Sequence, residues 1–356
     1  MTEIAAGARR RARLVWVAPI ALLALVAWVT FRLVRTAREP QFATFTGEAM
    51  AAAWQVTLPE RRDPAVAAAA ASDCFALFRR LDLELSEWQK GSPLAAVNRA
   101  AGERPIAVPS ELYALVTRGV EIGQATDGAF DISWAALWGL WDFRAPVPAV
   151  PAPAAITARR ALIDYRRVVL DPEAQTIFLP LAGMKLGLGG IAKGYALGRA
   201  GALLVERGFD DFLLVSGGQV FARGTRAGRS WQVGVRDPRG ERDEIFATLP
   251  LAGGSLSTSA DNESFFFVDD VRYHHILDPQ TGWPSQGVRS ATVLAADPTL
   301  ADALSTAVMV LGKERGLAVA TRLGAEALVV DDHGELAMTP GLAPRLTLLH
   351  PPRRGG

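Results

Sequence analysis

Hydrophobic positions recur at helical spacing in two long segments of the chain. In the first segment, the apolar residues that stand three or four positions apart are Phe75, Phe78, Leu81 and Leu85. Because one face of a helix repeats every 3.6 residues, this spacing predicts a helix over residues 65–88. A second helix is predicted over residues 108–126, where the same period continues.

Shorter apolar runs predict strands between and after these helices. Strands are predicted at residues 212–215, 231–236, 245–249, 264–268, 291–295 and 327–330. Residues 166–182 predict a hairpin that turns at Asp171 and Pro172. The Pro/Ala-rich segment 145–155 is expected to be a surface loop. Helices and strands are interspersed without regular alternation, which favours an α+β fold over a doubly wound one.

An apolar run from Leu14 to Phe31 precedes this pattern. Arginines flank it on both sides, at positions 9, 10, 11, 13, 32, 35 and 38. We interpret the run as an uncleaved membrane anchor with a short cytoplasmic N-terminus. A signal peptide cleaved near Ala37 is the alternative. The expected organisation is a basic segment at 1–13, an anchor at 14–31, a tether at 32–44, one domain at 45–349 and a tail at 350–356.

Charge and cysteine content exclude some classes of protein. The net charge is +1, and residues 1–40 contribute seven Arg and two Glu, or +5, which leaves the remainder at −4. A mildly acidic body argues against nucleic-acid binding. The one cysteine, Cys74, lies in an apolar helical run and is predicted to be a core residue.

A candidate metal site lies on the helix that is predicted to begin after Asp297. Asp297 can cap this helix and Pro298 suits its first position. Its expected buried face comprises Leu304, Ala307, Val308 and Leu311. Asp302 and Thr306 are four residues apart on the other face, so their oxygens should lie within about 5–6 Å. Such oxygens suit Mg²⁺, although the spacing alone favours the solvated side of an amphipathic helix.

A glycine-rich segment around Lys193 is a candidate anion site. Its glycines are Gly187, Gly189, Gly190 and Gly194. A glycine turn before a helix exposes backbone N–H groups, and a lysine adds a charge suited to phosphate. The spacing matches neither common nucleotide-binding motif, and a turn that serves only packing is the alternative.

Aromatic and hydroxyl residues add further candidates. Trp134, Trp138 and Trp141 are expected on one helical face as a core stripe. The turn at 128–131 can receive a ring or a ribose, and Trp88 either stacks on a base or fills the edge of the core. Residues 254–261 suggest a serine-rich turn that contacts a ligand.

His275 is either a general base or a structural residue at a strand end. No His/Cys/Glu spacing fits zinc, and no serine-hydrolase elbow occurs.

Four long motifs occur in order in the body of the chain. They are GGIAKGYA at 189–196, STS followed by Asp261, HHILDPQTGWP at 274–284 and ADALSTAVMVLG at 301–312. Together they resemble the FAD:protein FMN transferases, the ApbE family, over about residues 47–312. The resemblance implies a mixed-sheet α+β fold and the Mg²⁺-dependent transfer of FMN from FAD to a threonine hydroxyl, with release of AMP.

The resemblance also implies roles for individual positions. It makes Asp302, Thr306 and the backbone carbonyl of Gly190 the metal ligands. It places flavin-nucleotide contacts at Met50, Trp88, Ala129, Phe130, Asp131, Gly187, Lys193, His275 and Ile276. Lys193 would offset charge on the phosphate and His275 would activate the threonine, with Asp278 as an alternative proton acceptor.

The chain departs from the family pattern at several positions. Alanines follow Met50 in place of Gly-Thr, and Trp88 replaces tyrosine. Gly187 replaces an aspartate that contacts the nucleotide, and Gln219 replaces an acidic residue. Ala260 and Asn262 replace Gly and Tyr. None of these changes is expected to touch the metal pair or Lys193.

The leading hypothesis is therefore a single-pass protein of the bacterial inner membrane with a periplasmic flavin transferase domain. Its partners would be FAD and exported subunits of redox complexes that carry the acceptor threonine. The alternatives are an FAD pyrophosphatase that yields FMN and AMP, and a flavin-binding protein without turnover.

Overall fold

The computed structural model describes residues 25, 26, 28, 41–60 and 63–354. Within these residues, no helix has both the length and the apolarity that a membrane span requires. The expected anchor at 14–31 lies outside the described residues except for positions 25, 26 and 28, as do the basic segment and most of the tether. The compact unit described below covers residues 42–356.

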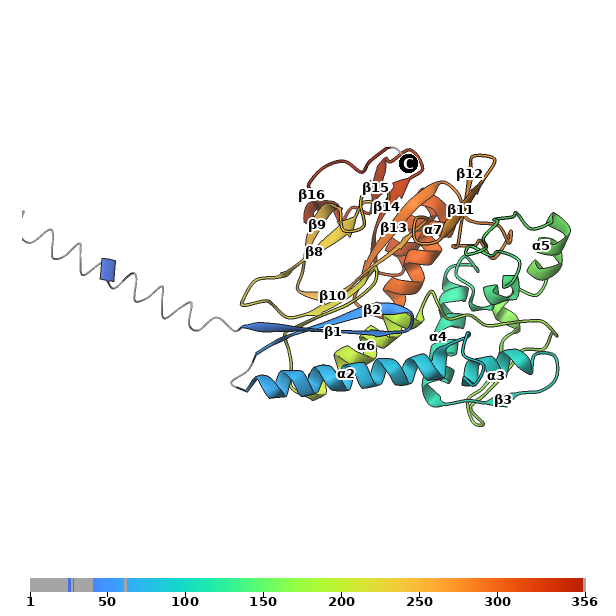
Figure 1. Cartoon of the computed structure of the whole chain (residues 1–356), viewed down its shortest axis with the longest axis horizontal. Coiled ribbons are helices and arrows are strands. Elements are labelled where there is room, and N and C mark those ends of the chain that lie inside the picture. Colours follow the sequence, from blue (N-terminus) through green and yellow to red (C-terminus); the bar gives the residue numbers. More distant parts are fainter. Residues whose placement is uncertain (1–24, 27, 29–40, 61–62, 355–356) are drawn as a thin grey trace, which may run out of the picture. The chain divides into compact units, whose positions relative to one another are not determined.

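An eight-stranded sheet runs through the centre of this unit (Figure 1). In spatial order its strands are β1 (Phe42–Ala49), β2 (Ala52–Pro59), β6 (Phe212–Ser216), β7 (Gln219–Arg223), β10 (Gly253–Ala260), β13 (Val288–Ala295), β14 (Glu326–Asp331) and β15 (Leu336–Met338). The α+β class is confirmed. Every neighbouring pair is antiparallel, rather than the mixture of directions that we expected. Short turns join β1 to β2 and β6 to β7, and such turns produce antiparallel neighbours.

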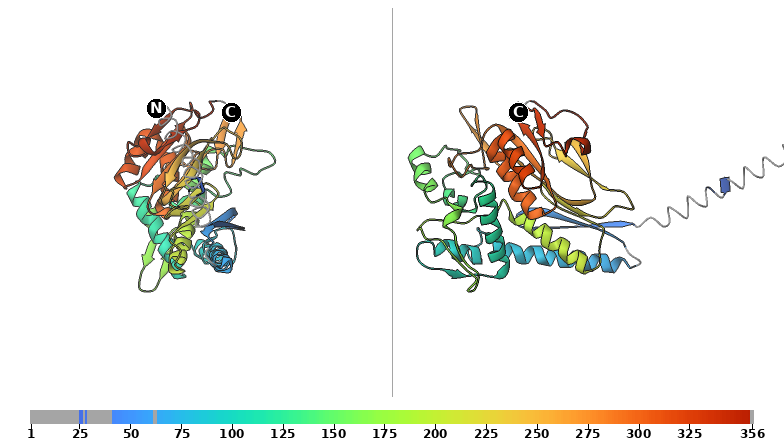
Figure 2. Two further views of the ribbon diagram at one scale, coloured as in Figure 1. Left: turned by 90° about the vertical axis from the view of Figure 1, so that its left-hand side faces the viewer. Right: turned by 180° about the vertical axis from the view of Figure 1, so that it is seen from behind.

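Three long helices cover one face of the sheet (Figure 2). They are α2 (Pro64–Leu85), α6 (Ala192–Glu206) and α7 (Pro298–Arg322). Helix α2 contacts β1 and β2, α6 contacts β6 and β7, and α7 contacts β10, β13 and β14. The main apolar core lies between these two layers and includes Cys74, as predicted.

The opposite face of the sheet packs against a small sheet of β8 (Trp231–Arg236), β9 (Ile245–Leu251) and β16 (Thr347–Leu348). A third sheet contains β3 (Ile106–Ala107), β4 (Val169–Asp171) and β5 (Thr176–Phe178), and its β4–β5 hairpin turns where predicted. The remaining strands, β11 (Phe265–Val268) and β12 (Val271–His274), pair with each other. The remaining helices are α3 (Pro93–Arg99), α4 (Ser110–Ala125), α5 (Pro153–Arg160), η1 (Ile132–Leu137), η2 (Tyr165–Arg167) and η3 (Ala343–Arg345).

Helix α7 begins as its sequence predicts. The Asp297 carboxylate accepts a hydrogen bond from the Thr299 N–H at 2.9 Å, and Pro298 occupies the first turn. Leu304, Ala307 and Val308 are fully buried, but Asp302 is also buried, at 2% exposure. The interpretation of Asp302 as a solvated residue is therefore wrong, because α6 packs against the face that carries it.

Three local predictions need correction. Residues 254–261 form strand β10 instead of a turn, because they pair with β7 on one side and β13 on the other. The three tryptophans do not share a helical face, since η1 ends at Leu137. The Trp138 ring contacts Trp88 and Trp134, whereas the Trp141 ring contacts Phe143, Phe266, Tyr273 and Trp283. Residues 145–152 are a mostly exposed loop, but Pro153 then begins α5.

Candidate active site

Loops from distant parts of the chain surround a cavity of about 810 Å³. The lining residues described by the sequence analysis are Trp88, Ala129, Phe130, Asp131, Trp134, Gly189, Gly190, Lys193, Gln219, Thr258, Ser259, Ala260, Asn262, His275, Ile276, Asp302 and Thr306. They come from the ends of α2 and β10, the start of α6, the middle of α7 and the segment after β12. A cavity of this size suits a ligand larger than a single nucleotide base.

Asp302 is the buried carboxylate of this cavity. It accepts hydrogen bonds from the Gly194 N–H at 2.8 Å and from the Gln219 side-chain amide at 3.0 Å. Burial raises its pKa, while the positive charge of Lys193 acts in the opposite direction. Lys193 and Gly194 come from α6 and Gln219 comes from β7, so two elements hold the carboxylate. The expectation that no departure from the family pattern touches the metal pair is therefore wrong for Gln219.

The backbone of Gly190 lies close to the Thr306 hydroxyl. A Cβ atom on Gly190 would be 3.3 Å from Thr306 Oγ1. The Ser259 hydroxyl lies 3.3 Å from the same oxygen and 2.8 Å from that of Ser305. The structure therefore brings together the expected carboxylate, hydroxyl and glycine backbone, and adds a second hydroxyl from β10. This is a set of hard oxygen donors, which fits Mg²⁺.

His275 lines the cavity directly after β12. Its Nδ1 is buried and has no hydrogen-bond partner among the described residues. Burial, with a smaller contribution from His274, lowers the pKa of His275 to about 4. The imidazole is therefore neutral at pH 7 and able to accept a proton. By contrast, the neighbouring His274 is structural, because its Nε2 contacts the Ser285 carbonyl at 2.7 Å.

Glu87 is a cavity residue that the sequence analysis missed. Its carboxylate accepts the Leu188 N–H at 3.4 Å, at the glycine turn that leads to Gly190. Burial raises the pKa of Glu87 to about 7. Its position next to Trp88 was the available signal, but only the fold shows that this segment meets residues a hundred positions later.

Trp88 forms part of an aromatic wall. It is 72% exposed and stacks on Trp138 with ring centroids 4.3 Å apart. Trp134 lies edge-on to Trp138 and donates its indole N–H to the Gly187 carbonyl at 3.1 Å. Trp88 and Trp134 both line the cavity, so this wall offers a stacking surface for a flat ring.

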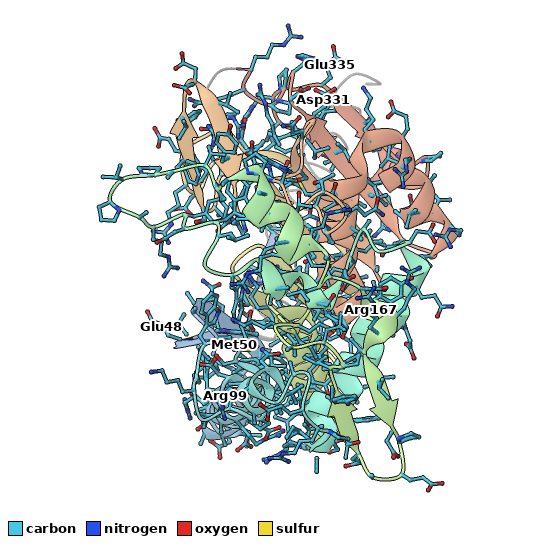
Figure 3. The ribbon with its side chains drawn as sticks, turned by 90° about the vertical axis from the view of Figure 1, so that its right-hand side faces the viewer. Glu48, Met50, Arg99, Arg167, Asp331 and Glu335 are labelled. Carbon is cyan, nitrogen blue, oxygen red and sulfur yellow. The ribbon has the colours of Figure 1, made fainter. Side chains whose placement is uncertain are left out.

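Two expected nucleotide contacts are not among the lining residues. Met50 (Figure 3) occupies the β1–β2 turn with a φ of 50° and packs against the core. The following alanines 51–53 line the cavity. Gly187 is buried behind Trp134, and its N–H donates to the Ile132 carbonyl. Asp131 does line the cavity, but its oxygens accept hydrogen bonds from Ser133 and the Tyr165 N–H.

Asp261 and Asp278 lie elsewhere. Asp261 forms a buried two-point ion pair with Arg239, with both distances at 2.6 Å. Asp278 accepts the Gln280 N–H. Its neighbours Leu277 and Pro279 line the cavity, but Asp278 itself is not among the lining residues. Of the two candidate proton acceptors, the structure therefore places His275 in the cavity.

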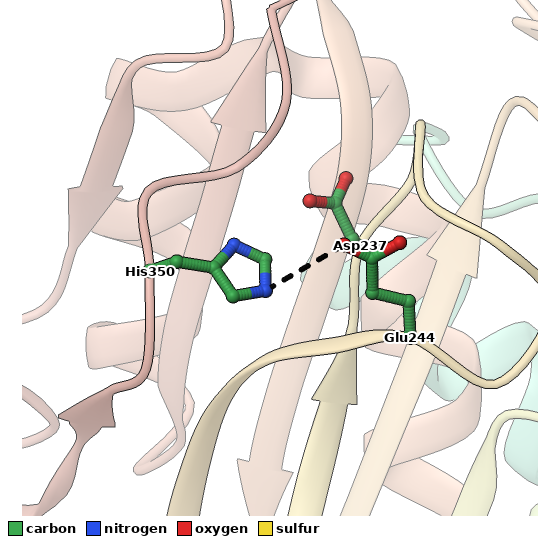
Figure 4. Close-up of side chains that lie close together, drawn as sticks. All are labelled: Asp237, Glu244 and His350. Atoms are coloured by element: carbon green, nitrogen blue, oxygen red, sulfur yellow. Dashed lines mark ion pairs between the residues drawn. The ribbon is translucent and has the colours of Figure 1, made fainter.

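The C-terminal segment supports one rim of the cavity. Asp237, Glu244 and His350 lie close together (Figure 4), and His350 Nε2 is 3.7 Å from Glu244. Arg353 donates its backbone N–H to Asp237 and its guanidinium to Glu244. Because these carboxylates already bind Arg353, the cluster fastens the tail to loop 237–244.

Comparisons with known proteins agree with this arrangement. The sequence model described as "ApbE family" matches residues 50–329. A protein of Treponema pallidum named FAD:protein FMN transferase is 35% identical over 311 residues, which cover 83% of this chain and 86% of that protein. The crystal structure of an ApbE protein from Thermotoga maritima aligns with a TM-score of 0.79 at 31% identity, over 86% of this chain and 99% of that one. The flavin transferase ApbE of Vibrio cholerae aligns with a TM-score of 0.77 at 25% identity, with the same coverage.

Proposed function

The chain belongs to the ApbE family, and we propose that this transferase moves FMN from FAD to a threonine hydroxyl of an acceptor protein, with Mg²⁺ as its cofactor and AMP as the second product. The observation that carries the proposal is the grouping of Asp302, Thr306 and the Gly190 backbone in one cavity with Lys193 and a neutral His275.

The residues divide the chemistry between them. Asp302, Thr306 and the Gly190 carbonyl would hold Mg²⁺, which offsets negative charge on phosphate oxygens when it is bound. Lys193, at the start of α6, places a positive charge that also offsets the negative charge on the phosphate oxygens. The aromatic wall at Trp88 and Trp134 holds a flat ring by stacking, which orients the dinucleotide.

His275 accepts the proton of the incoming threonine. The threonine oxygen forms a bond to the FMN phosphorus, and the bond from that phosphorus to the bridging oxygen breaks. AMP leaves with the electron pair of the broken bond, and the proton stays on His275 until it passes to solvent. A neutral imidazole is required at the start of this step, in keeping with its lowered pKa.

The test uses purified protein with FAD, Mg²⁺ and a candidate acceptor. We expect AMP together with an acceptor whose mass increases by that of FMN. The substitution Asp302→Asn should lower AMP formation by at least about a hundredfold, because metal binding is lost. The matched control is Asp297→Asn on the same helix, which retains a cap residue and should leave the rate unchanged.

The other outcomes identify the alternatives. Free FMN and AMP without an acceptor adduct would mean that water is the nucleophile, as in a pyrophosphatase. Tight FAD binding with no AMP would indicate a flavin-binding protein. Full activity of the Asp302→Asn variant would refute the metal assignment.

The location of the domain is part of the proposal. The arginine-flanked apolar run at 14–31 supports a single membrane anchor, with the catalytic domain in the periplasm. Alkaline phosphatase fused after residue 356 should be active in a bacterial host, since this enzyme matures outside the cytoplasm. If the phosphatase fusion is inactive and a green fluorescent protein fusion at the same position is fluorescent, the domain lies in the cytoplasm and the proposed orientation is wrong.

A further inference from the structure

The β11–β12 hairpin projects from the body of the domain (Figures 1 and 2). Asn262 and Glu263 line the cavity just before β11, and His275 and Ile276 line it just after β12. The His275 N–H donates to the Ser264 carbonyl at 3.0 Å and closes the base of the hairpin. A ligand on this hairpin would therefore be adjacent to the expected proton acceptor.

One face of the hairpin is already used for packing. Phe266 is 6% exposed and stacks on Tyr273 at 5.4 Å, and both rings contact Trp141. A strand with one buried face normally presents polar residues on the other. This hairpin presents Phe265 and Phe267 instead, at 37% and 50% exposure.

Arg272 completes the exposed face. Its guanidinium lies 4.0 Å from the Phe265 ring centroid and 4.9 Å from that of Phe267. Within the described part of the chain, no carboxylate lies within 4 Å of it, and Asp261 is engaged by Arg239. Arg239 and Arg289 act on Arg272 with like charge and Asp261 acts on it with opposite charge, so the base of the hairpin has an excess of positive charge. The face thus combines two aromatic rings with a cation that can pair with an acid.

The reaction itself requires a docking surface at this rim. A threonine of a folded protein can reach a cavity that holds a dinucleotide only from its mouth. Catalysis also requires that the hydroxyl be held within reach of the base. Residues at the mouth beside His275 are therefore positioned to bind the polypeptide on either side of that threonine.

We propose that the hairpin face formed by Phe265, Phe267 and Arg272 binds an extended segment of the acceptor protein, with apolar side chains on the two rings and a carboxylate on Arg272. This inference rests on the proposed function, since it assumes a protein acceptor. The hairpin tip carries Asp269 and Asp270, which repel an acidic segment and favour placing its carboxylate at the Arg272 guanidinium, over the Phe265 ring.

The test probes the full-length protein, in detergent with FAD and Mg²⁺, with a library of peptides that have a central threonine and random flanking residues. Bound peptides are sequenced, and transfer is measured by their flavin fluorescence. We expect enrichment of aliphatic and acidic flanks. The double variant Phe265→Ser, Phe267→Ser should remove the preference for apolar flanks. Arg272→Glu should remove the preference for acidic flanks. Each variant should bind the selected peptides with about a tenfold or greater loss of affinity.

Matched controls separate docking from folding and from the chemistry. Val169→Ser removes an exposed apolar side chain on β4, and Arg166→Gln removes a cation near a tyrosine ring. Both controls should keep the wild-type selection. All variants should bind FAD within about twofold of wild type, because none of the substituted residues lines the cavity.

The results distinguish this inference from the proposed function. Suppose that the library yields a flank preference that the hairpin variants change, but no flavin transfer. This result would support the docking face and count against the transferase proposal. Transfer with no flank preference, or with a preference that the variants leave unchanged, would overturn the docking face. An absence of bound peptides would also overturn the docking face. Two further results would do the same: self-association of the protein that the phenylalanine variant abolishes, and binding to phosphatidylglycerol vesicles that depends on these residues.

Discussion

At the scale of single residues, the site depends on a few side chains held in unusual surroundings. Asp302 is buried and is hydrogen-bonded by groups from two other elements, and His275 is kept neutral by burial. Gln219 orients Asp302 through its amide, a role that no local pattern in the sequence indicates. Groups that orient a metal ligand in this way often matter nearly as much as the ligand.

Replacing Gln219 should weaken metal binding. In Gln219→Met, one Asp302 oxygen loses its hydrogen-bond donor while the side-chain volume is nearly kept. We expect the apparent affinity for Mg²⁺ to fall about tenfold, measured both by titrating AMP formation and by the Mg²⁺-induced rise in melting temperature. Gln232→Met, at an exposed position on β8, is the control. Equal Mg²⁺ affinity in both variants would exclude the orienting role.

The pH dependence of the rate should follow the protonation of the His275 imidazole. Its pKa falls from 6.5 to about 4, so the proton-accepting form persists as the pH drops below 6.5. We expect AMP formation with acceptor to retain its rate between pH 6.5 and 5 and to lose it near pH 4. His275→Gln should lower the rate by about a hundredfold or more. A midpoint near pH 6.5 in the wild-type profile would disagree with a buried base.

The same shift has a consequence for folding stability. Between pH 6.5 and about 4 the unfolded chain binds a proton at this position and the folded chain does not. The contribution of His275 to stability therefore declines as the pH falls through this window.

At the scale of elements, the close approach of α6 and α7 places Lys193 beside Asp302. A Cβ atom on Gly194 would lie 2.2 Å from the Pro298 carbonyl oxygen and 2.6 Å from Asp302 Cβ. Glycine at this position is thus a requirement of helix packing and not of a turn. The glycine that follows Lys193 therefore has its physical reason in this contact.

Gly194→Ala should separate the two helices. We expect a loss of about 1–3 kcal/mol in the free energy of unfolding, measured in urea, because the added methyl group overpacks the contact. Mg²⁺ affinity should also fall as Asp302 shifts. Gly198→Ala, one turn later, would meet only Pro298 Cγ at 3.3 Å and should change stability by less than about 1 kcal/mol. Similar stabilities for the two variants would contradict this view of the packing.

At the scale of the whole molecule, the cavity joins segments from both ends of the domain. The β1–β2 turn contributes alanines 51–53, and the segment 350–354 holds loop 237–244 through Arg353. Arg289 also binds this tail, through the carbonyls of Arg353 and Arg354. The C-terminal residues therefore belong functionally to the cavity rim, although the sequence analysis treated them as a tail.

Removing the Arg353 side chain should loosen this rim. In Arg353→Ala we expect faster amide hydrogen exchange in residues 237–244 and weaker FAD binding, while the melting temperature changes little because the ion pair is exposed. Arg354→Ala keeps the backbone carbonyl that Arg289 binds and serves as the control. Unchanged exchange in the Arg353 variant would show that the backbone contacts alone hold the loop.

The sequence by itself determined the features that depend on neighbouring residues. The N-terminal cap of α7, the β4–β5 hairpin and the spacing of Asp302 and Thr306 follow from local rules, and the long motifs identified the family. Only the tertiary structure decided the burial of Asp302, the placing of Gln219, Ser259 and Glu87 around the site, and the exposure of Phe265 and Phe267. These properties arise where segments far apart in the chain meet, and spacing along the chain contains no information about such meetings.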